Sequence, residues 1–237
     1  MAGLTPLAVT SYGVAARRAD FAIAKSGLKG KKVLITSGPT WVAIDSVRVI
    51  SNTATGETGI ELAKKFIQQG CRVTLLLGPV NIASLDNKIK VKRFSFFKEL
   101  NTLLKSELKK DFDIVIQSAA ISDFAPKLSD NKKISSGCKK LKLILKPTVK
   151  IINCLRKLKP NAFLVGFKFE PHFKARKLIK KTRNLIKSAN LDLAVGNNLL
   201  DKQYSAYLVN KTDAYGPFLS KPAMVNNLIK LIERKYV

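Results

Sequence analysis

Short apolar segments alternate with longer amphipathic segments along most of this chain, and this alternation constrains the fold more than any other feature. The first pair shows the pattern. Residues 32–37 (KVLITS) are β-branched and apolar, which predicts a buried strand, and residues 57–69 carry apolar side chains at helical spacing before Gly70. Strands that alternate with helices predict a Rossmann-like, doubly wound α/β fold with a mainly parallel sheet and helices on both faces.

The same pattern predicts the other elements. Strands are expected at residues 72–77, 112–118, 141–146, 162–167, 191–195 and 204–209, the last at an edge of the sheet. Helices are expected at residues 96–109, 149–158, 173–188 and 222–234. No change in composition divides these elements, so residues 31–237 are predicted to form one domain. Residues 1–30 are expected to be an N-terminal extension, partly helical around residues 15–26.

The charge of the chain is its most unusual bulk property. The formal net charge is +27, and such an excess favours nucleic acid, a membrane surface or phosphorylated small molecules as partners. Residues 139–187 alone hold sixteen basic residues against one acid, Glu170. A solvated lysine-rich surface also explains much of the excess, and no nucleic-acid-reading motif is present. A nucleic-acid-binding α/β protein that uses the surface of residues 139–187 stays an alternative, and weak, non-specific nucleic-acid binding is expected from the charge in either case. No membrane partner is expected, because no apolar run approaches ~18 residues.

Several classes of site are disfavoured by the motifs. Cys71, Cys138 and Cys154 form no C-x-x-C pair and His172 is the only histidine, so no metal site built by the protein alone is predicted. The phosphate-binding sequence G-x-x-x-x-G-K-[ST] is absent. The turn after the first strand (SGPTW) lacks the glycines of a dinucleotide site, which argues against an NAD-type oxidoreductase. A reduced, cytoplasmic protein is expected.

Three segments that follow predicted strands carry the candidate ligand-binding residues, because such sheets bind ligands beyond the carboxyl ends of their strands. The first, residues 38–56, is much longer than the roughly 2–6 residues usual in such connections. Arg48 can pair with a carboxylate or phosphate, and Asn52 can both donate and accept hydrogen bonds. The small residues before the helix leave backbone N–H groups for an anion, although a turn capped by threonine explains them equally.

The second segment, residues 119–133, begins with two alanines that let a ligand approach the backbone. Asp123 can accept from a ribose or position a cation, and the lysines at the end of the segment can meet a polyphosphate. A surface loop without a ligand is the alternative. The third segment, residues 166–168 (GFK), offers a phenylalanine to stack on a base and a lysine for phosphate, with core packing as the alternative.

Taken together, these segments resemble one family. The motifs TSGPTW, SNTATGETG, VTLLLGPV, QSAAISDFAPK, KKISSG and LVGFKFE occur in this order between about residue 32 and the C-terminus. In this order and spacing they are similar to the motifs of phosphopantothenate–cysteine ligases, also called phosphopantothenoylcysteine synthetases. In bacteria this activity is often the second half of a bifunctional coenzyme A biosynthesis flavoprotein. The thirty leading residues are too few for the flavin-containing half, so a stand-alone ligase is expected.

The resemblance implies an activity and its substrates. CTP, with ATP as the alternative, activates the carboxylate of 4′-phosphopantothenate as an acyl nucleotide and releases pyrophosphate, with Mg2+ accompanying the triphosphate. The amine of L-cysteine then displaces the nucleotide and gives phosphopantothenoylcysteine. Members of the family resemble one another in forming homodimers, with parts of the site reaching across the interface. Residues 31–237 would then be the nucleotide-binding ligase domain.

The resemblance also implies roles for individual residues. Asn52 matches the residue that holds the acyl-nucleotide intermediate, Arg48 serves the second half-reaction, and Lys133 belongs to a mobile basic motif that acts on the triphosphate. The residues expected to contact the nucleotide are Gly38, Ala119, Ala120, Asp123, Lys133, Val149, Lys150, Ile151, Ile152, Phe167 and Lys168.

The chain departs from the family pattern in places. The KKISSG motif has fewer lysines than the corresponding motif of many family members, and Val149 stands where proline is usual in the family. Leu185 and Ala189 stand where two lysines are common, so the phosphate contacts of the helix at residues 173–188 are open, with Lys181, Arg183 or Lys187 as substitutes.

Overall fold

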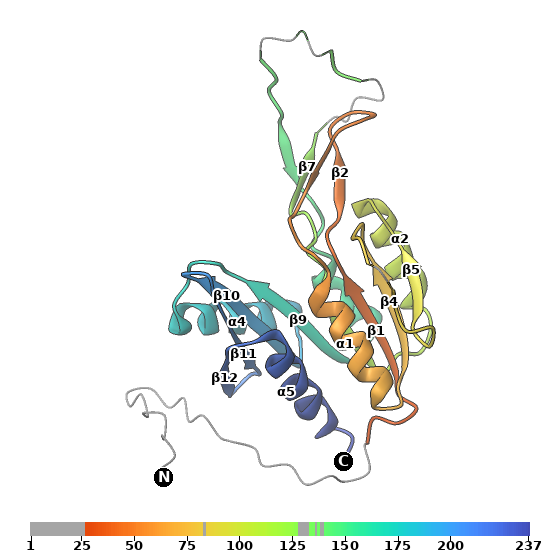
Figure 1. Cartoon of the computed structure of the whole chain (residues 1–237), viewed down its shortest axis with the longest axis vertical. Helices are drawn as coiled ribbons and strands as arrows, with labels where there is room; N and C mark the ends of the chain where they lie inside the picture. Colours follow the sequence, from red (N-terminus) through yellow and green to blue (C-terminus); the bar gives the residue numbers. More distant parts are fainter. Residues whose placement is uncertain (1–26, 83, 128–132, 136, 138–139) are drawn as a thin grey trace.

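The computed structural model describes residues 27–82, 84–127, 133–135, 137 and 140–237. In this part of the chain, eight strands form one sheet in the order β12-β11-β10-β9-β6-β1-β4-β5 (Figure 1). Its parallel strands are β1 (Lys32–Ser37), β4 (Arg72–Leu77), β5 (Lys90–Arg93), β6 (Ile114–Gln117), β9 (Phe163–Phe169) and β10 (Leu193–Leu200). Two antiparallel strands, β11 (Gln203–Val209) and β12 (Ala214–Phe218), extend one edge.

The order of the parallel strands confirms the Rossmann-like prediction. Counted along the chain, these strands lie in the spatial order third, second, first, fourth, fifth and sixth, which is the order of a doubly wound dinucleotide-type sheet. The direction of winding reverses between β1 and β6. In sheets of this kind, ligands bind beyond the carboxyl ends of the strands at such a reversal.

Helices cover both faces of the sheet, as predicted (Figure 1). On one face, α1 (Glu57–Gln68) and α5 (Lys221–Glu233) pack on residues such as Ile35 and Leu75. On the other face, α2 (Phe97–Glu107), η1 (Ile151–Cys154), α3 (Leu155–Leu158) and α4 (Ala175–Ala189) pack on residues such as Leu34 and Leu76. Because successive residues of a strand point to opposite faces, the continuous apolar runs of β1 and β4 serve both cores.

An arm built from two small sheets extends away from this body (Figure 1). One pairs β2 (Trp41–Ala43) with β3 (Val49–Ser51), and the other pairs β7 (Phe124–Pro126) with β8 (Leu145–Pro147). Both grow out of the loops that follow β1 and β6, and β2 contacts β7. The arm exposes a set of large apolar side chains: Val47, Val49, Phe124, Leu141, Leu143, Ile144, Leu145 and Val149.

Most predicted elements are confirmed, but the arm is not what the sequence predicted. The strands at residues 32–37 and 72–77 have the predicted limits, and the helix at 57–69 ends one residue earlier. The strand predicted at residues 141–146 is wrong, because pairing begins only at Leu145 and the alternating side chains before it are exposed. The helix predicted at 149–158 begins later, as the 3-10 turn η1.

The short strands β2, β3, β5, β7 and β12 were not predicted. The predicted helix around residues 15–26 lies outside the described residues, and Leu28 is already buried in the core beneath α1 and α5. None of the helices in the described ranges is both long and apolar enough to cross a membrane.

Candidate functional site

The loops after β1 and β6 are joined where the winding of the sheet reverses. Ala120 N donates to Gly38 O at 2.9 Å, and Thr40 N donates to Ala120 O at 3.3 Å. Below this pair, the buried hydroxyls of Thr40 and Ser122 lie 3.1 Å apart, and Ser122 N donates to Thr40 Oγ1 at 2.9 Å. These bonds fix the two loops relative to each other, so the first residues after both strands form one rigid floor.

Asn52 lies on this floor. Its Nδ2 donates to Ala120 O at 2.9 Å, although the two residues are 68 positions apart in the chain. The side chain of Asn52 is exposed, and its Oδ1 makes no hydrogen bond to any described residue. One half of the amide is therefore held in place while the other half is available to a ligand.

The N-terminus of α1 approaches the same floor. Gly56 precedes the helix with φ 76°, a left-handed conformation that favours glycine, and Ser37 Oγ donates to its carbonyl at 2.7 Å. A Cβ at Gly59 would lie 2.5 Å from Ser37 and 2.7 Å from Ser118 Oγ, so only glycine lets α1 come this close. No side chain caps the helix, and Thr55 Oγ1 accepts from Glu57 N only at 3.5 Å. Its first N–H groups can therefore face an anion.

Residues 149–152 are tied to the floor through Thr148. Thr148 N donates to Asp123 O at 2.8 Å, and Thr148 Oγ1 donates to Ser122 O at 2.6 Å. Asp123 itself is exposed, and its carboxylate forms no ion pair with a described residue. Val149 and Lys150 are exposed, whereas Ile151 and Ile152 turn into the core. The structure thus brings Gly38, Asn52, Ala119, Ala120, Asp123 and the start of η1 to one place.

Gly166, the first residue of the predicted ligand-binding segment 166–168, serves close packing in the structure. A Cβ at this position would lie 2.6 Å from Leu191 Cδ1 and 2.9 Å from Ile152 Cδ1. The glycine therefore allows η1 and the segment before β10 to pack on β9, rather than leaving room for a ligand. Its neighbour Phe167 points to the opposite face, where it packs half-buried against the core under α1 and α5.

Lys168 lies at the carboxyl end of β9 and is held by an acid. Its Nζ is 3.1 Å from Glu170 Oε1, and Lys181 of α4 reaches the same oxygen at 3.1 Å. Burial would raise the pKa of Glu170, but hydrogen bonds from the two lysines outweigh it and lower the pKa. The pair of cations is therefore balanced by a single ionised carboxylate, which leaves a net positive charge at the end of β9.

Two of the three proposed substitutes on α4, Lys181 and Arg183, have their own partners in the described structure. Lys181 also lies over the ring of Phe173, 4.4 Å from its centroid, and Arg183 donates to Thr212 O at 3.0 Å. Leu185 packs against the core and Ala189 is buried. The positions where lysines are common in the family are therefore packing positions in this chain.

Arg48 and Lys133 lie apart from the floor. Arg48 sits at the turn between β2 and β3, on the far side of β3 from Asn52, roughly 13 Å along an extended strand. Its guanidinium pairs with the buried carboxylate of Asp45 at 2.8 Å and donates to Ile134 O at 3.3 Å. Lys133 precedes Ile134 and is exposed. Within one protomer the structure thus places the two cations together on the arm and away from Asn52.

Asp45 holds the turn that carries Arg48. Its carboxylate accepts from Val47 N at 2.8 Å, Arg48 N at 2.7 Å and Ile134 N at 3.1 Å. The hydrogen bond from Val47, with those from Arg48 and Ile134, outweighs burial and lowers the pKa of Asp45 to about 2. The carboxylate is ionised at neutral pH, so its role is to join the two halves of the arm.

Sequence reasoning missed several residues of this site. Thr40 and Ser122 were not singled out, because hydroxyls after a strand are common and only their pairing in space shows that they lock the loops. Gln117, at the carboxyl end of β6, and Asn197, of β10, each bury a side-chain oxygen without a hydrogen-bond partner among the described residues. Such atoms are rare and call for a partner. Their position beside β9 indicates where a ligand could supply donors.

Comparison with known proteins identifies the family of this chain. Residues 28–233 match the family model described as "DNA/pantothenate metabolism flavoprotein C-terminal domain". The coenzyme A biosynthesis bifunctional protein CoaBC of Thermococcus kodakarensis is 40% identical over 174 residues, which cover 73% of this chain and 42% of that protein. The chain spans about half the length of the curated relatives it matches.

Solved structures show the same fold. The DNA/pantothenate metabolism flavoprotein from Streptococcus pneumoniae has a TM-score of 0.78 at 26% identity, over 87% of this chain and all of that one. A Cab2 variant in complex with phosphopantothenate-cysteine has a TM-score of 0.70 at 23% identity, over 87% of each chain. The chain therefore belongs to the family of DNA/pantothenate metabolism flavoprotein C-terminal domains.

Proposed function

We propose that this domain is a phosphopantothenate–cysteine ligase of coenzyme A biosynthesis. It would use CTP to activate the carboxylate of 4′-phosphopantothenate and then form an amide with the amine of L-cysteine. The single observation that carries the proposal is the hydrogen bond from Asn52 to Ala120 O, at the reversal point of the sheet and beside the uncapped N-terminus of α1. The family membership and the Cab2 complex with phosphopantothenate-cysteine support the choice of substrates.

In the first half-reaction, the carboxylate oxygen of phosphopantothenate attacks the α-phosphorus of CTP, and the bond to pyrophosphate breaks. Negative charge gathers at that phosphorus, where fixed donors and cations are most effective. The N–H groups at the start of α1 and the ammonium of Lys168 are suitable donors in this chain. Gly38, Ala119 and Ala120 present backbone without bulky side chains, so the nucleotide can lie close to the floor.

The remaining nucleotide contacts are assigned to the two sides of the floor. Val149, Lys150, Ile151 and Ile152 lead into η1, and Phe167 offers an aromatic ring at the end of β9. The unpartnered Oε1 of Gln117 is an acceptor that a ligand N–H can satisfy. Mg2+ enters as part of the Mg–nucleotide substrate, since such ions are commonly held by one or two carboxylates and substrate phosphates. Asp123 has a carboxylate suited to that position.

In the second half-reaction, the cysteine nitrogen attacks the acyl carbon and CMP leaves with the bonding electrons. The free Oδ1 of Asn52 can accept a hydrogen bond from the attacking amine, because Nδ2 is already engaged with Ala120. The rate gain here comes from positioning two bound reactants. No enzyme nucleophile is required, and the thiol that enters the product belongs to the substrate.

Arg48 and Lys133 reach a site only if two chains associate. The arm exposes several large apolar side chains, among them Val47 and Val49 on either side of Arg48, and such a patch marks an interface. We assign the arm to a homodimer in which each arm crosses to the partner's floor. In that arrangement Arg48 and Lys133 would serve the site of the partner subunit.

Pyrophosphate release gives the direct test. Purified protein with Mg2+, CTP and 4′-phosphopantothenate should release pyrophosphate, and added L-cysteine should yield phosphopantothenoylcysteine and CMP. Asn52→Asp should still be stabilised thermally by CTP but should form product slowly. Absence of pyrophosphate with CTP and with ATP would overturn the proposed activity, and release with ATP alone would overturn the choice of nucleotide.

A further inference from the structure

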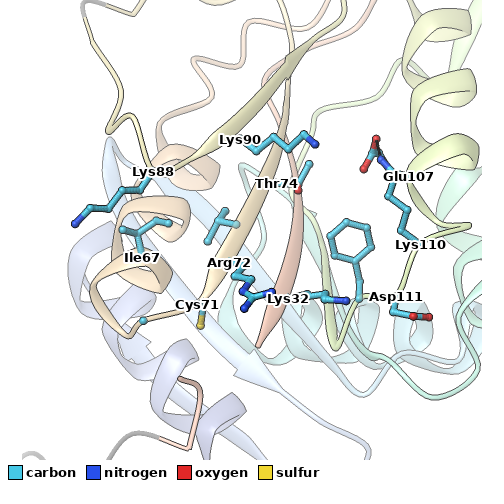
Figure 2. A pocket seen from close by; sticks show the side chains of 13 residues that line it. Lys32, Ile67, Cys71, Arg72, Thr74, Lys88, Lys90, Glu107, Lys110 and Asp111 are labelled. Carbon is cyan, nitrogen blue, oxygen red and sulfur yellow. Dashed lines mark hydrogen bonds and ion pairs between the residues drawn. The ribbon is translucent and has the colours of Figure 1, made fainter. Parts of the chain in front are cut away.

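A cavity of about 560 Å³ opens at the amino ends of the strands, on the edge opposite the floor. Its wall includes the first residues of three parallel strands, namely Lys32 of β1, Arg72 of β4 and Lys90 of β5 (Figure 2). The floor lies beyond the carboxyl ends of these strands, and a six-residue strand spans roughly 20 Å. The cavity is therefore separate from the proposed ligase site.

A second hollow continues the first. It measures about 450 Å³ and shares Lys32, Asp111 and Phe112 with the larger cavity. Its far side is formed by the turn between α3 and β9, including Lys159 and Pro160. Each volume lies within the roughly 300–1,000 Å³ usual for small-molecule sites. Together they offer an elongated space along the amino edge of the sheet.

The cavity carries positive charge that the protein does not balance. Lys32, Arg72, Lys88 and Lys90 line it, and their side chains form no ion pair with any described residue. The opposing carboxylate of Glu107 is already satisfied, because Lys92 and Lys110 each approach its Oε1 at 2.6 Å.

Glu107 is almost completely buried, so this triad is a fixed part of the wall. Asp111 is the one other acid that lines the cavity, and it is exposed. An anion in the cavity would therefore pair with cations that form no ion pair within the described part of the protein.

Thr74 adds an unused polar group. Its side chain is 8% exposed and lines the cavity from the middle of β4, yet its hydroxyl makes no hydrogen bond to any described residue (Figure 2). The hydroxyl is therefore open to a ligand or water in the cavity (Figure 2). Phe112 supplies apolar surface on the same face of the sheet, whereas Ile67 and Val73 line the cavity from the face that α1 covers. The cavity thus combines cations, one hydroxyl and an apolar wall.

The cavity is suited to binding rather than to covalent chemistry. Cys71 is the one thiol among its lining residues, and it is buried with Sγ donating to Leu28 O at 3.2 Å. Burial, with the nearby Asp113 and Glu233, raises the pKa of this thiol to about 11, so it stays protonated.

We infer that the cavity at the amino edge is a second ligand site, which binds a small organic anion with an acidic head and an apolar body. The head, a phosphate or a carboxylate, lies between Lys32 and Lys90 and accepts from the Thr74 hydroxyl. The apolar body lies against Phe112 and extends toward the second hollow. This site is independent of the proposed ligase activity, since it shares none of the floor residues.

Titration calorimetry with 1-naphthyl phosphate and 1-naphthoate tests the inference. Inorganic phosphate, which is the acidic head alone, and 1-naphthol, which is the apolar body alone, are titrated as the isolated halves. One of the two aromatic anions should bind saturably, and more tightly than either half, and the tighter of the two identifies the head group. Lys32→Glu/Lys90→Glu should weaken binding by more than about tenfold, as expected for lost charge-assisted bonds. Thr74→Val, which keeps the side-chain shape, should weaken it by about fivefold.

Two control variants locate the binding. Lys180→Glu changes an exposed lysine of α4 that forms no ion pair with a described residue, and Arg48→Ala changes the arm. Neither should alter the affinity for the naphthyl anion. Circular dichroism should show that each variant is folded.

Three outcomes would overturn the inference. The first is no saturable binding by the wild-type protein. In the second, Lys180→Glu weakens binding as much as the double variant does, which would indicate general surface charge. In the third, Arg48→Ala abolishes binding while Lys32→Glu/Lys90→Glu does not, which would move the ligand to the arm. If single-stranded oligonucleotide displaces the naphthyl anion and binds more tightly, a nucleic-acid surface replaces the small-molecule site.

Discussion

The floor of the site and the arm above it are built on the same two loops, yet they are completed in different ways. On the floor, the residues after β1 and β6 satisfy one another through Thr40, Ser122, Ala120 and Asn52. On the arm, buried Asp45 joins the two small sheets, but large apolar side chains remain exposed. One chain is sufficient to build the floor. The arm has the composition of a surface that meets another chain.

The largest effect is expected at Asn52, the residue that joins the floor to the reacting groups. Asn52→Ala should lower the rate of product formation by ~10²–10³-fold, as for other fixed polar groups that stabilise developing charge. The control Asn87→Ala changes an exposed asparagine on the loop before β5 and should leave the rate unchanged. Steady-state kinetics of both variants checks this. An active Asn52→Ala protein would remove the floor from the mechanism.

Mixing two inactive variants tests whether the arm serves the partner subunit. Asn52→Ala is defective on the floor and Arg48→Ala on the arm. If each arm completes the other protomer's site, a mixed dimer has one site with both defects and one site with neither. Equal mixing after dissociation should then restore about a quarter of the wild-type activity, because half of the dimers are mixed and half of their sites are intact. Activity that stays at the level of the parent variants would contradict an arm that crosses over.

The apolar patch itself can be tested by introducing charge. Ile144 is 71% exposed on the arm and Leu219 is 73% exposed on the body, before α5. Ile144→Lys should weaken the dimer by at least about tenfold, because a buried unpaired charge is costly at an interface. Leu219→Lys should not change the dimer. Analytical ultracentrifugation over a concentration series separates the two, and an equal response of both variants would remove the arm from the interface.

A smaller effect is expected from unlocking the floor. Thr40→Val keeps the shape but leaves the buried Ser122 N–H and hydroxyl without this partner. The free energy of unfolding should fall by about 2 kcal/mol, the usual penalty for such unsatisfied groups. Thr53→Val, at an exposed position nearby, is the matched control. Urea unfolding measures both, and equal stability of Thr40→Val and wild type would show that the loops do not depend on this lock.

The smallest effect is a pH dependence of the arm. Backbone hydrogen bonds, first that of Val47, lower the pKa of Asp45 to about 2 from an ordinary 3.8. A lowered folded-state pKa means that this stabilisation is complete above pH 3.8 and is lost as the pH falls toward 2. Asp45→Asn should therefore lose less stability than wild type between pH 5 and pH 2. Urea midpoints across that range provide the measurement, and parallel curves for the two proteins would contradict it.

Much of the floor was predictable because its signals are local. The apolar strands and amphipathic helices predict the sheet. The long connection at residues 38–56 and the two alanines after β6 then mark the edge of the sheet at which a ligand is expected to bind. Other features gave no local signal. The alternating residues 141–146 predict a strand, but alternation does not say whether a partner strand is present. Gly166 suggests ligand access until Ile152 and Leu191 are found against it.

The sequence by itself determined the alternation of elements, the parallel sheet, and the presence of polar and small residues at the ends of β1 and β6. These follow from side-chain periodicity and backbone preferences, which act over a few residues. Only the tertiary structure decided that Asn52 meets Ala120, that Arg48 lies away from both, and that uncompensated lysines surround a cavity at the opposite edge. Those relations depend on contacts between residues far apart in the chain, and such contacts exist only once the sheet is assembled.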